Sequence, residues 1–347
     1  MGKTRFAIIG AGNIGKTHAQ AITDISEAEL RVVCEPIEER GRALAATYGA
    51  DWVADYREAV TRPDVDVVCI CTPSGSHAEP AVAAARAGKH LIVEKPIDVT
   101  LERIDRIIAA AKEGGIKLTC IFPLRFRQGV SEARKALEAG RLGRLVLADA
   151  FVKWYRPQSY YEGSWRGSWA LDGGGALMNQ SIHSIDLLQW LAGPVESVVG
   201  RTATLAHQHM ETEDTASAVL VFRNGALGVV QGATSCWPGE GARVELRGDR
   251  GTIALEEGRI ATWKLADARP GEEETMLALE QSLGSGCSNP TAISYELHRR
   301  QIADLIGAIG DDRPPAISGA DARKAVEIIL AIYRSAATRA SVALPLG

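Results

Sequence analysis

The sequence lacks the features that mark nucleic-acid-binding and membrane proteins. Its 39 Lys and Arg stand against 43 Asp and Glu, for a formal net charge of −4, and the basic residues are spread along the chain. Without a basic patch, a nucleic-acid partner is not expected. No run reaches 18 apolar residues and the first residues lead directly into a predicted strand, so neither a membrane span nor a signal peptide is expected. These absences predict a cytoplasmic protein.

Cysteine is also scarce, with 6 residues in 347. Cys34, Cys69, Cys71 and Cys120 lie inside apolar runs, which favours buried, reduced thiols over disulfides. Cys69-x-Cys71 has no second pair nearby, so the sequence predicts no metal there. The length exceeds that at which a single core stops growing, so about two domains are expected.

The N-terminal segment has the glycine pattern of a dinucleotide-binding turn. An apolar run at Arg5–Ile9 enters Gly-x-Gly-x-x-Gly, and a helical pattern follows. The first glycine permits a tight turn, the second a close approach to a pyrophosphate, and the third close packing of helix on strand. A glycine-rich turn without a ligand is the alternative. Because an acid that can bind a ribose hydroxyl follows at the end of the next strand, we favour NAD binding by Gly10, Gly12, Asn13, Ile14, Gly15 and Glu35.

Strand-like and helix-like segments alternate through the first third of the chain, from Leu30–Cys34 to Lys117–Phe122. This alternation predicts a parallel sheet with both faces covered. After about Arg144, longer strand-like segments joined by Asn-Gly and Arg-Gly turns predict an antiparallel sheet. We therefore expect an α/β protein: a Rossmann, doubly wound parallel sheet in residues 1–123, which bind NAD, and an α+β domain with a large, mostly antiparallel open sheet in residues 124–347, which bind substrate and form oligomers.

Later segments add three helices and one loop to this expectation. Capping and periodicity predict helices at Gly175–Leu191, Tyr295–Ile309 and Ala320–Thr338. Arg269–Gly286 is expected as an acidic surface loop. The strands Ala216–Phe222 and Leu227–Val230 are too apolar for a solvated face, so a homodimer or homotetramer through this sheet is expected.

Glu94-Lys95-Pro96 follows the fifth predicted strand. Ligands of doubly wound sheets bind outside the carboxyl ends of the strands, so Lys95 is expected beside the cofactor. A lysine there can donate to a carbonyl, or accept a proton from a hydroxyl if its pKa is lowered. The alternative is a surface lysine before a turn.

A second polar cluster follows three glycines, in the segment Asp172–Asp186. Met178, Ile182, Ile185 and Leu188 recur at helical spacing and predict a core-facing stripe. Asn179, His183 and Asp186 form a neighbouring polar stripe, expected to face a cleft or solvent. The glycines would let the backbone approach a ligand. We interpret His183 as a catalytic candidate, with a structural histidine as the alternative.

Aromatic residues make up only 5% of the chain, yet six of them fall within 16 residues, alongside the cations Lys153, Arg156 and Arg166. Aromatic faces pack on the C–H faces of sugar rings, and cations bind hydroxyls or acidic groups. Tyr155, Trp165 and Arg166 are therefore substrate-binding candidates, with a packed core and lid as the alternative. His207-x-His209 with Glu211, Glu213 and Asp214 suits a polar loop as well as a metal site, and no metal is expected.

Together these residues resemble the Gfo/Idh/MocA family, the glucose-fructose oxidoreductase and inositol dehydrogenase group. The resemblance rests on the glycine pattern, Cys71-Thr72-Pro73-Ser74-x-x-His77, Glu94-Lys95-Pro96, Arg125-Phe126 and the triple-glycine segment that ends at His183. It implies NAD or NADP as cofactor, Lys95 and His183 as catalytic residues, and an open sheet that forms the oligomer interface. It further implies that Thr72, Pro73, His77, Glu94 and Arg125 lie near the nicotinamide half, with Lys95, Arg125, Asn179 and His183 also toward the substrate.

One residue departs from the family pattern. The usual aspartate four residues before the histidine is Asn179 here, so the sequence does not support a proton relay through that carboxylate. With one negative neighbour fewer, Lys95 is expected to lose its proton more readily, and His183 is the competing base. The Asn-Gln-x-Ile-His form resembles the subgroup that contains UDP-N-acetylglucosaminuronate dehydrogenases.

The sequence thus predicts an NAD-dependent oxidoreductase acting on a secondary alcohol of a sugar, cyclitol or sugar acid, in which Lys95, His183 and Asn179 form the catalytic group. Two alternatives stay open. One is a glycosidase that retains NAD and oxidises a ring carbon transiently. The other is a catalytically silent nucleotide-binding regulator, disfavoured because Lys95 and His183 are both present.

Overall fold

The computed structural model describes residues 2–279 and 294–347. The chain forms two compact units. The first contains the chain up to Pro123 together with Tyr295–Arg323, and the second contains the rest. Among the described residues, no helix combines the length and the apolar character needed to cross a membrane.

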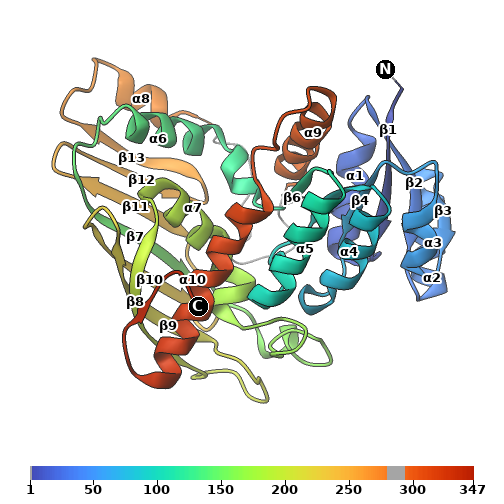
Figure 1. Cartoon of the computed structure of the whole chain (residues 1–347). Coiled ribbons are helices and arrows are strands. Elements are labelled where there is room, and N and C mark those ends of the chain that lie inside the picture. Colours follow the sequence, from blue (N-terminus) through green and yellow to red (C-terminus); the bar gives the residue numbers. More distant parts are fainter. Residues whose placement is uncertain (1, 280–293) are drawn as a thin grey trace. The chain divides into compact units, whose positions relative to one another are not determined.

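The first unit is built on a six-stranded parallel sheet in the order β3-β2-β1-β4-β5-β6 (Figure 1). This order is that of the dinucleotide-binding Rossmann fold and confirms the predicted doubly wound sheet. Its strands consist largely of buried aliphatic residues, as expected where both faces are covered. They are β1 (Thr4–Ile9), β2 (Ala28–Cys34), β3 (Asp51–Val53), β4 (Val67–Ile70), β5 (His90–Val93) and β6 (Leu118–Cys120).

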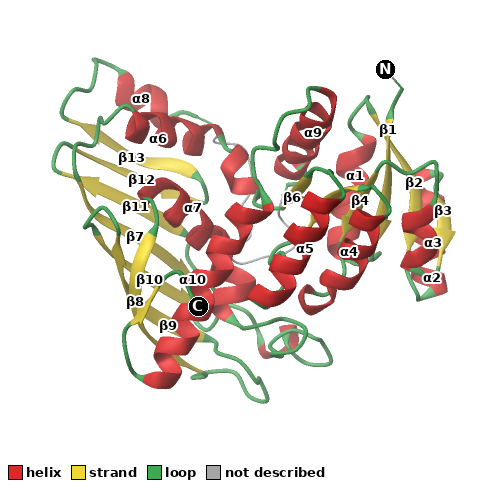
Figure 2. Ribbon diagram, viewed as in Figure 1, coloured by secondary structure: helices red, strands yellow, loops and turns green. Residues whose placement is uncertain are grey.

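Helices between the strands cover this sheet (Figure 2). Two of them have a side-chain N-cap: Asp55 accepts from the N–H of Arg57, and Thr100 from that of Arg103. The helices of this unit are α1 (Asn13–Thr23), α2 (Glu38–Tyr48), α3 (Tyr56–Thr61), η1 (Ser74–Ser76), α4 (Ala78–Arg86), α5 (Leu101–Glu113) and α9 (Glu296–Gly310).

Helix α9 corrects the expected domain boundary. Residues 295–323 were expected in the second domain, but they belong to the first unit. Ile302 and Leu305 are fully buried in its core. The amide of Gln301 donates to the carbonyl of Cys120 (2.7 Å) and accepts from the N–H of Phe122 (3.1 Å). The chain therefore returns to complete the first unit before it ends in the second.

The second unit is built on an open eight-stranded sheet in the order β13-β12-β11-β7-β10-β9-β8-β14. Among the strand pairs of the described residues, only β7–β10 is parallel in this sheet, so the expected mostly antiparallel sheet is confirmed. The strands are β7 (Leu145–Lys153), β8 (Val195–Ala203), β9 (Thr215–Phe222), β10 (Leu227–Ala233), β11 (Arg243–Gly248), β12 (Gly251–Glu256), β13 (Arg259–Leu265) and β14 (Val342–Ala343).

Helices pack on one face of this sheet, α7 on β7 and β11, and α6 on β12 and β13 (Figure 2). The remaining elements are η2 (Pro123–Phe126), α6 (Gln128–Glu138), η3 (Gln158–Tyr160), the π-helix η4 (Ala176–Ser181), α7 (Ile182–Ala192), α8 (Glu272–Leu277) and α10 (Gly319–Thr338), which continues from the first unit into the second.

Two predicted segments differ in detail. The helix expected over Gly175–Leu191 is a π-helix followed by an α-helix. The acidic loop expected from Arg269 contains helix α8, because the carboxylate of Glu272 pairs with Arg141 and accepts from the indole of Trp263. The end of that expected loop lies outside the described residues.

Candidate functional site

The turn after β1 has the geometry to hold a dinucleotide. Gly10 has φ +104°, and a Cβ there would lie 2.6 Å from the carbonyl oxygen of Cys71. A Cβ at Gly15 would lie 2.1 Å from the carbonyl oxygen of Gly10. Gly12 instead faces open space before α1, whose first turn has neither an acidic residue nor a side-chain cap. The N–H groups of Asn13 and Ile14 at this helix start can therefore receive a phosphate anion, so these residues fit NAD.

Glu35 closes β2 beside this turn. Its buried carboxylate accepts from the N–H of Ala11 (2.9 Å) and from the guanidinium of Arg40 (2.6 Å). Burial alone would raise the pKa of Glu35, but these hydrogen bonds outweigh it and hold the pKa below its usual value. Glu35 is therefore an anion at neutral pH, as an acceptor for ribose hydroxyls must be.

His77 ties the loop after β4 to the loop after β5. Its buried ring lies with Nδ1 2.9 Å from the carbonyl oxygen of Pro96 and Nε2 3.0 Å from that of Thr72. Both ring nitrogens are thus engaged by backbone. His77 holds in place the loops that carry Thr72, Pro73 and Lys95, rather than offering its ring to a ligand.

Glu94 is the centre of a buried cluster that joins α1, the end of β5 and α9. Its Oε1 lies 2.8 Å from Nε2 of His18 and 3.8 Å from Nε2 of His298. Burial opposes ionisation of Glu94, but the hydrogen bond from His18 outweighs it and lowers the pKa to about 2. Burial also lowers the pKa of His298 to about 4, so this imidazole is neutral at neutral pH.

The same three side chains have the donor set of a metal site, with ligand atoms within 4.8 Å of one another. Histidines that bind metal almost always donate the other ring N–H to an acceptor. Nδ1 of His18 and of His298 are buried and find no such acceptor among the described residues. The three side chains therefore fit an ionised Glu94 that accepts a hydrogen bond from His18 better than they fit a metal ion. This cluster could not be predicted from the sequence, because His298 reaches it on a helix expected in the other domain.

Lys95 is half-buried at the carboxyl end of β5, where the sequence predicts it. Its backbone N–H donates to Oε2 of Glu94 at 3.2 Å. The charge of Lys95 also helps to lower the pKa of Glu94. Lys95 therefore has a negative neighbour within its own unit that the sequence analysis did not foresee.

In the second unit, Asn179 lies in the π-helix and His183 in the first turn of α7, both half-buried. π-Helical turns are rare and are frequent at functional sites. The apolar stripe predicted beside them is buried, as expected. The amide of Asn179 donates to the buried carboxylate of Asp172 (2.5 Å) and accepts from the amide of Gln180 (3.1 Å).

Asp186, expected to face a cleft or solvent, is buried instead. Its carboxylate accepts two hydrogen bonds from Arg125, at 2.7 and 2.5 Å. The guanidinium of Arg125 also lies 4.9 Å from the ring centroid of Trp190. Arg125 thus anchors η2 to α7, and among the described residues its remaining nitrogen, Nη1, has no hydrogen-bond partner.

The aromatic and cationic segment lies beside the π-helix. Gln180 donates to the hydroxyl of Tyr160 at 3.0 Å, and the guanidinium of Arg166 lies 4.5 Å from the Tyr160 ring centroid and 5.5 Å from that of Trp165. Tyr155 stacks edge to face with Trp237, which is 78% exposed. Trp154 and Tyr161, by contrast, are buried, so part of this segment is core.

The residues around His207 do not converge on a common point. His207 contacts the Asp214 carboxylate through Nδ1 (3.1 Å) and the Arg156 carbonyl through Nε2 (2.8 Å). Glu211 accepts from the N–H of Trp169, and Glu213 is turned toward the π-helix. This geometry is that of a hydrogen-bonded loop.

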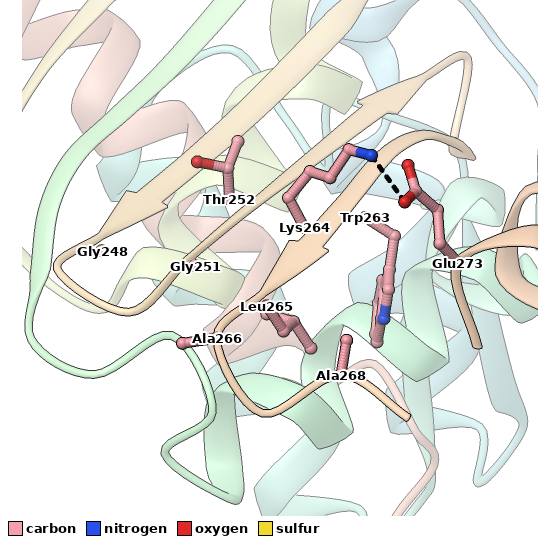
Figure 3. A pocket seen from close by; sticks show the side chains of 9 residues that line it. All are labelled: Gly248, Gly251, Thr252, Trp263, Lys264, Leu265, Ala266, Ala268 and Glu273. Carbon is pink, nitrogen blue, oxygen red and sulfur yellow. Dashed lines mark hydrogen bonds and ion pairs between the residues drawn. The ribbon is translucent and has the colours of Figure 1, made fainter. Parts of the chain in front are cut away.

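A separate hollow of about 410 Å³ lies at the ends of β12 and β13 (Figure 3). Gly248, Gly251 and Thr252 line one part of it, and Lys264 pairs with Glu273 at its rim (2.6 Å). It contains none of the predicted site residues, and we assign it no role.

Comparison with known proteins identifies both units by family. Residues 4–122 match the model described as the oxidoreductase family with an NAD-binding Rossmann fold, and residues 130–254 match the Gfo/Idh/MocA C-terminal domain. Among curated proteins, myo-inositol 2-dehydrogenase of Thermotoga maritima is 28% identical over 98% of each chain.

Two solved structures extend the comparison. The WlbA dehydrogenase of Bordetella pertussis, crystallised with NADH and UDP-GlcNAcA, has a TM-score of 0.89 and 33% identity over 100% of this chain and 99% of that one. Levoglucosan dehydrogenase, crystallised with NADH and levoglucosan, has a TM-score of 0.86 and 26% identity over 99% of this chain and 100% of that one.

Proposed function

The chain belongs to the Gfo/Idh/MocA family and is an NAD-dependent oxidoreductase, and on that premise we propose that it oxidises a secondary alcohol of a sugar, cyclitol or sugar acid. The observation that carries this substrate class is the continuous set of polar groups in the second unit. Asn179, Gln180 and Tyr160 are linked by hydrogen bonds, and the Arg166 guanidinium lies on the Tyr160 ring. Amide, phenol and guanidinium groups bind hydroxyls, and aromatic rings pack on sugar C–H faces.

The proposed chemistry divides between cofactor and protein. Bound NAD supplies a hydride acceptor at C4 of its nicotinamide ring. Gly12 and the start of α1 would hold the pyrophosphate, and Glu35 would accept from the ribose hydroxyls. Lys95 and His183 are the proposed groups that take the hydroxyl proton and stabilise the developing alkoxide. Asn179 orients the substrate through its amide.

The names of relatives support this substrate class, since they include inositol, levoglucosan and 1,5-anhydro-D-fructose enzymes. None of these names is that of a glycosidase, so the comparisons favour the dehydrogenase over the NAD-retaining glycosidase. The test is a panel of inositols, free sugars, sugar acids and nucleotide sugars, with NADH formation as readout. Turnover of at least one of them, lost in Lys95→Ala while the variant stays folded, is the expected result. No turnover across the panel, at protein concentrations that bind NAD, would contradict the proposal.

We further propose that a second copy covers the open face of the eight-stranded sheet. Val199, Val219 and Leu227 are 45%, 51% and 50% exposed there, on the three neighbouring strands β8, β9 and β10. Apolar patches of this kind mark association surfaces. Light scattering that shows a dimer or tetramer supports this, and a monomer of about 37 kDa at micromolar concentration contradicts it.

The cysteines support our proposal that the enzyme works in the cytoplasm. Cys34, Cys69, Cys71 and Cys120 are buried and take part in no disulfide among the described residues, and burial raises the thiol pKa of Cys34 to about 12. Inert, reduced thiols of this kind suit a reducing compartment.

A further inference from the structure

Glu213 connects the strand β9 to the start of the π-helix. It is 4% exposed and lies two residues before β9. Its carboxylate accepts from the N–H of Gly175 (3.1 Å) and the N–H of Leu177 (2.8 Å), and its backbone carbonyl accepts from the N–H of Ala176 (3.0 Å). Three successive N–H groups at the helix start therefore donate to one residue, Glu213.

These contacts replace a cap that the π-helix does not have locally. The first N–H groups of a helix have no partner within it and carry partial positive charge. Gly175, which precedes η4, offers no side chain to bind them. The hydroxyl of Tyr333, from α10, completes the arrangement by donating to the Glu213 carboxylate at 2.9 Å.

The glycines of the motif serve this contact. A Cβ at Gly175 would lie 1.8 Å from the carbonyl oxygen of Glu213, and a Cβ at Gly174 would lie 2.1 Å from the hydroxyl of Tyr333. These two glycines thus let the backbone come close to Glu213 and Tyr333. From the sequence, the same glycines predict room for a ligand; in the structure, Glu213 and Tyr333 occupy that space.

The segment that starts here carries the candidate catalytic side chains of the second unit. Within the π-helix, the hydroxyl of Ser181 donates to the carbonyl of Ala176 (2.8 Å). Asn179 lies within this turn and His183 follows it directly. A shift at the helix start therefore moves both side chains.

We infer that Glu213, supported by Tyr333, is a positioning residue that caps the π-helix and thereby sets the placement of Asn179 and His183. This inference rests on the proposed function, in which those two side chains contact the substrate. Glu213 itself acts through the backbone and takes no part in the hydride step.

The electrostatics around Glu213 add a pH dependence to this role. Burial raises the pKa of its carboxyl to about 7, against the hydrogen bonds from Leu177, Tyr333 and Gly175. Burial and the Glu213 charge raise the pKa of Tyr333 well above its usual value, so it stays a neutral donor, and Asp172 lies near Tyr333. Asp214 turns its carboxylate away, to the N–H groups of Leu205, Ala206 and His207. Protonation of Glu213 removes the anion that the helix start requires.

The first variant is Glu213→Gln, with Glu211→Gln as the matched control on the same loop. The control removes the same charge from a residue whose carboxylate, among the described residues, accepts from the N–H of Trp169. We expect Glu213→Gln to lower kcat at least about tenfold, to remove a limb of the kcat pH profile near neutrality, and to leave NADH binding, followed by fluorescence, unchanged. Glu211→Gln should match the wild type in all three.

The second measurement is amide hydrogen exchange of the peptide that spans residues 172–186, which needs no substrate. Faster exchange in Glu213→Gln, and wild-type exchange in Glu211→Gln, are expected. This readout separates the capping role from the proposed function, because it holds even if the substrate class is wrong. A folded Glu213→Gln with wild-type exchange, kcat and pH profile would overturn the inference.

Tyr333→Phe keeps the test open if Glu213→Gln does not fold. It removes one hydrogen bond that lowers the Glu213 pKa, so the pH limb should move to higher pH by about half a unit to one unit. A limb that stays at its wild-type position in a folded Tyr333→Phe variant would contradict the role of Glu213.

Discussion

The side-chain amide of Asn179 donates to Oδ1 of the buried Asp172 at 2.5 Å, and Oδ2 of Asp172 accepts from the N–H of Gly167 at 2.8 Å. The carboxylate that the family usually has at position 179 is thus absent, but another carboxylate lies one hydrogen bond away. An amide at 179 is the side chain that this neighbour requires, because two carboxylates at this distance cannot both ionise.

Asn179→Asp is therefore expected to destabilise the second unit rather than simply to supply a charge. Repulsion from Asp172 should cost about 1–3 kcal/mol at neutral pH and less in mild acid, where one carboxyl holds a proton. Thermal unfolding against pH measures this. The double variant Asp172→Asn with Asn179→Asp restores an amide–carboxylate pair and should regain most of the loss. A single variant as stable as the wild type at neutral pH would show that the pair does not constrain position 179.

The Arg125–Asp186 pair predicts a large loss of stability on removal of one partner. Asp186→Asn leaves a buried guanidinium without its anion, which costs about 3–5 kcal/mol. Urea denaturation at neutral pH measures it. The matched control is Glu138→Gln, which breaks the exposed Arg134–Glu138 pair (2.6 Å) and should cost less than about 0.5 kcal/mol. Equal losses of unfolding free energy in the two variants would mean that burial of the Arg125–Asp186 pair does not increase its contribution to stability.

His298 predicts a specific acid sensitivity. Its pKa falls from an ordinary 6.5 to about 4 in the folded protein, so the unfolded state binds the proton more readily. The free energy of unfolding should therefore decrease as the pH falls from about 6.5 to about 4, by up to about 3 kcal/mol. In His298→Gln the unfolding temperature should depend less on pH across this window. A pH dependence identical to that of the wild type would contradict a neutral, buried His298.

Coenzyme preference should follow from Glu35 and Arg40. The buried Glu35 anion repels a 2′-phosphate, so kcat/KM with NAD should exceed that with NADP at least about tenfold. Glu35→Ser removes the carboxylate that pairs with the Arg40 guanidinium, which is 48% exposed. In this variant, the ratio of kcat/KM with NAD to kcat/KM with NADP should fall. Adding Arg40→Ala to that variant should raise this ratio again. Equal efficiencies with the two coenzymes in the wild type would show that Glu35 does not discriminate.

Much of this architecture follows from sequence because its signals are local. The alternation of buried strands and helices, and the glycines of the first turn, predict the first unit, and turn dipeptides predict the antiparallel sheet. Residues whose environment depends on distant partners were missed. Asp186 has the spacing of a solvated stripe, but Arg125, 61 residues away, buries it. The π-helix keeps an almost helical pattern, and its cap, Glu213, lies in the loop before β9, more than 30 residues away.

The same reason explains the incomplete prediction of the site. Lys95 and His183 stand at ends of elements that periodicity locates, so their places in the fold could be predicted from the sequence. The environment of Lys95 could not be predicted, because the two histidines beside Glu94, His18 and His298, come from α1 and α9. A helix that returns to the first unit late in the chain leaves no local mark in the sequence.

The central claim is that this protein transfers a hydride from a carbinol carbon to NAD with net oxidation of the substrate. The most direct test uses a substrate from the panel deuterated at its reactive carbon, with product and coenzyme analysed by mass spectrometry. The account predicts one deuterated NADH for each ketone formed, and a primary isotope effect where hydride transfer limits the rate. Cleavage of a glycosidic bond with no net NADH would contradict it.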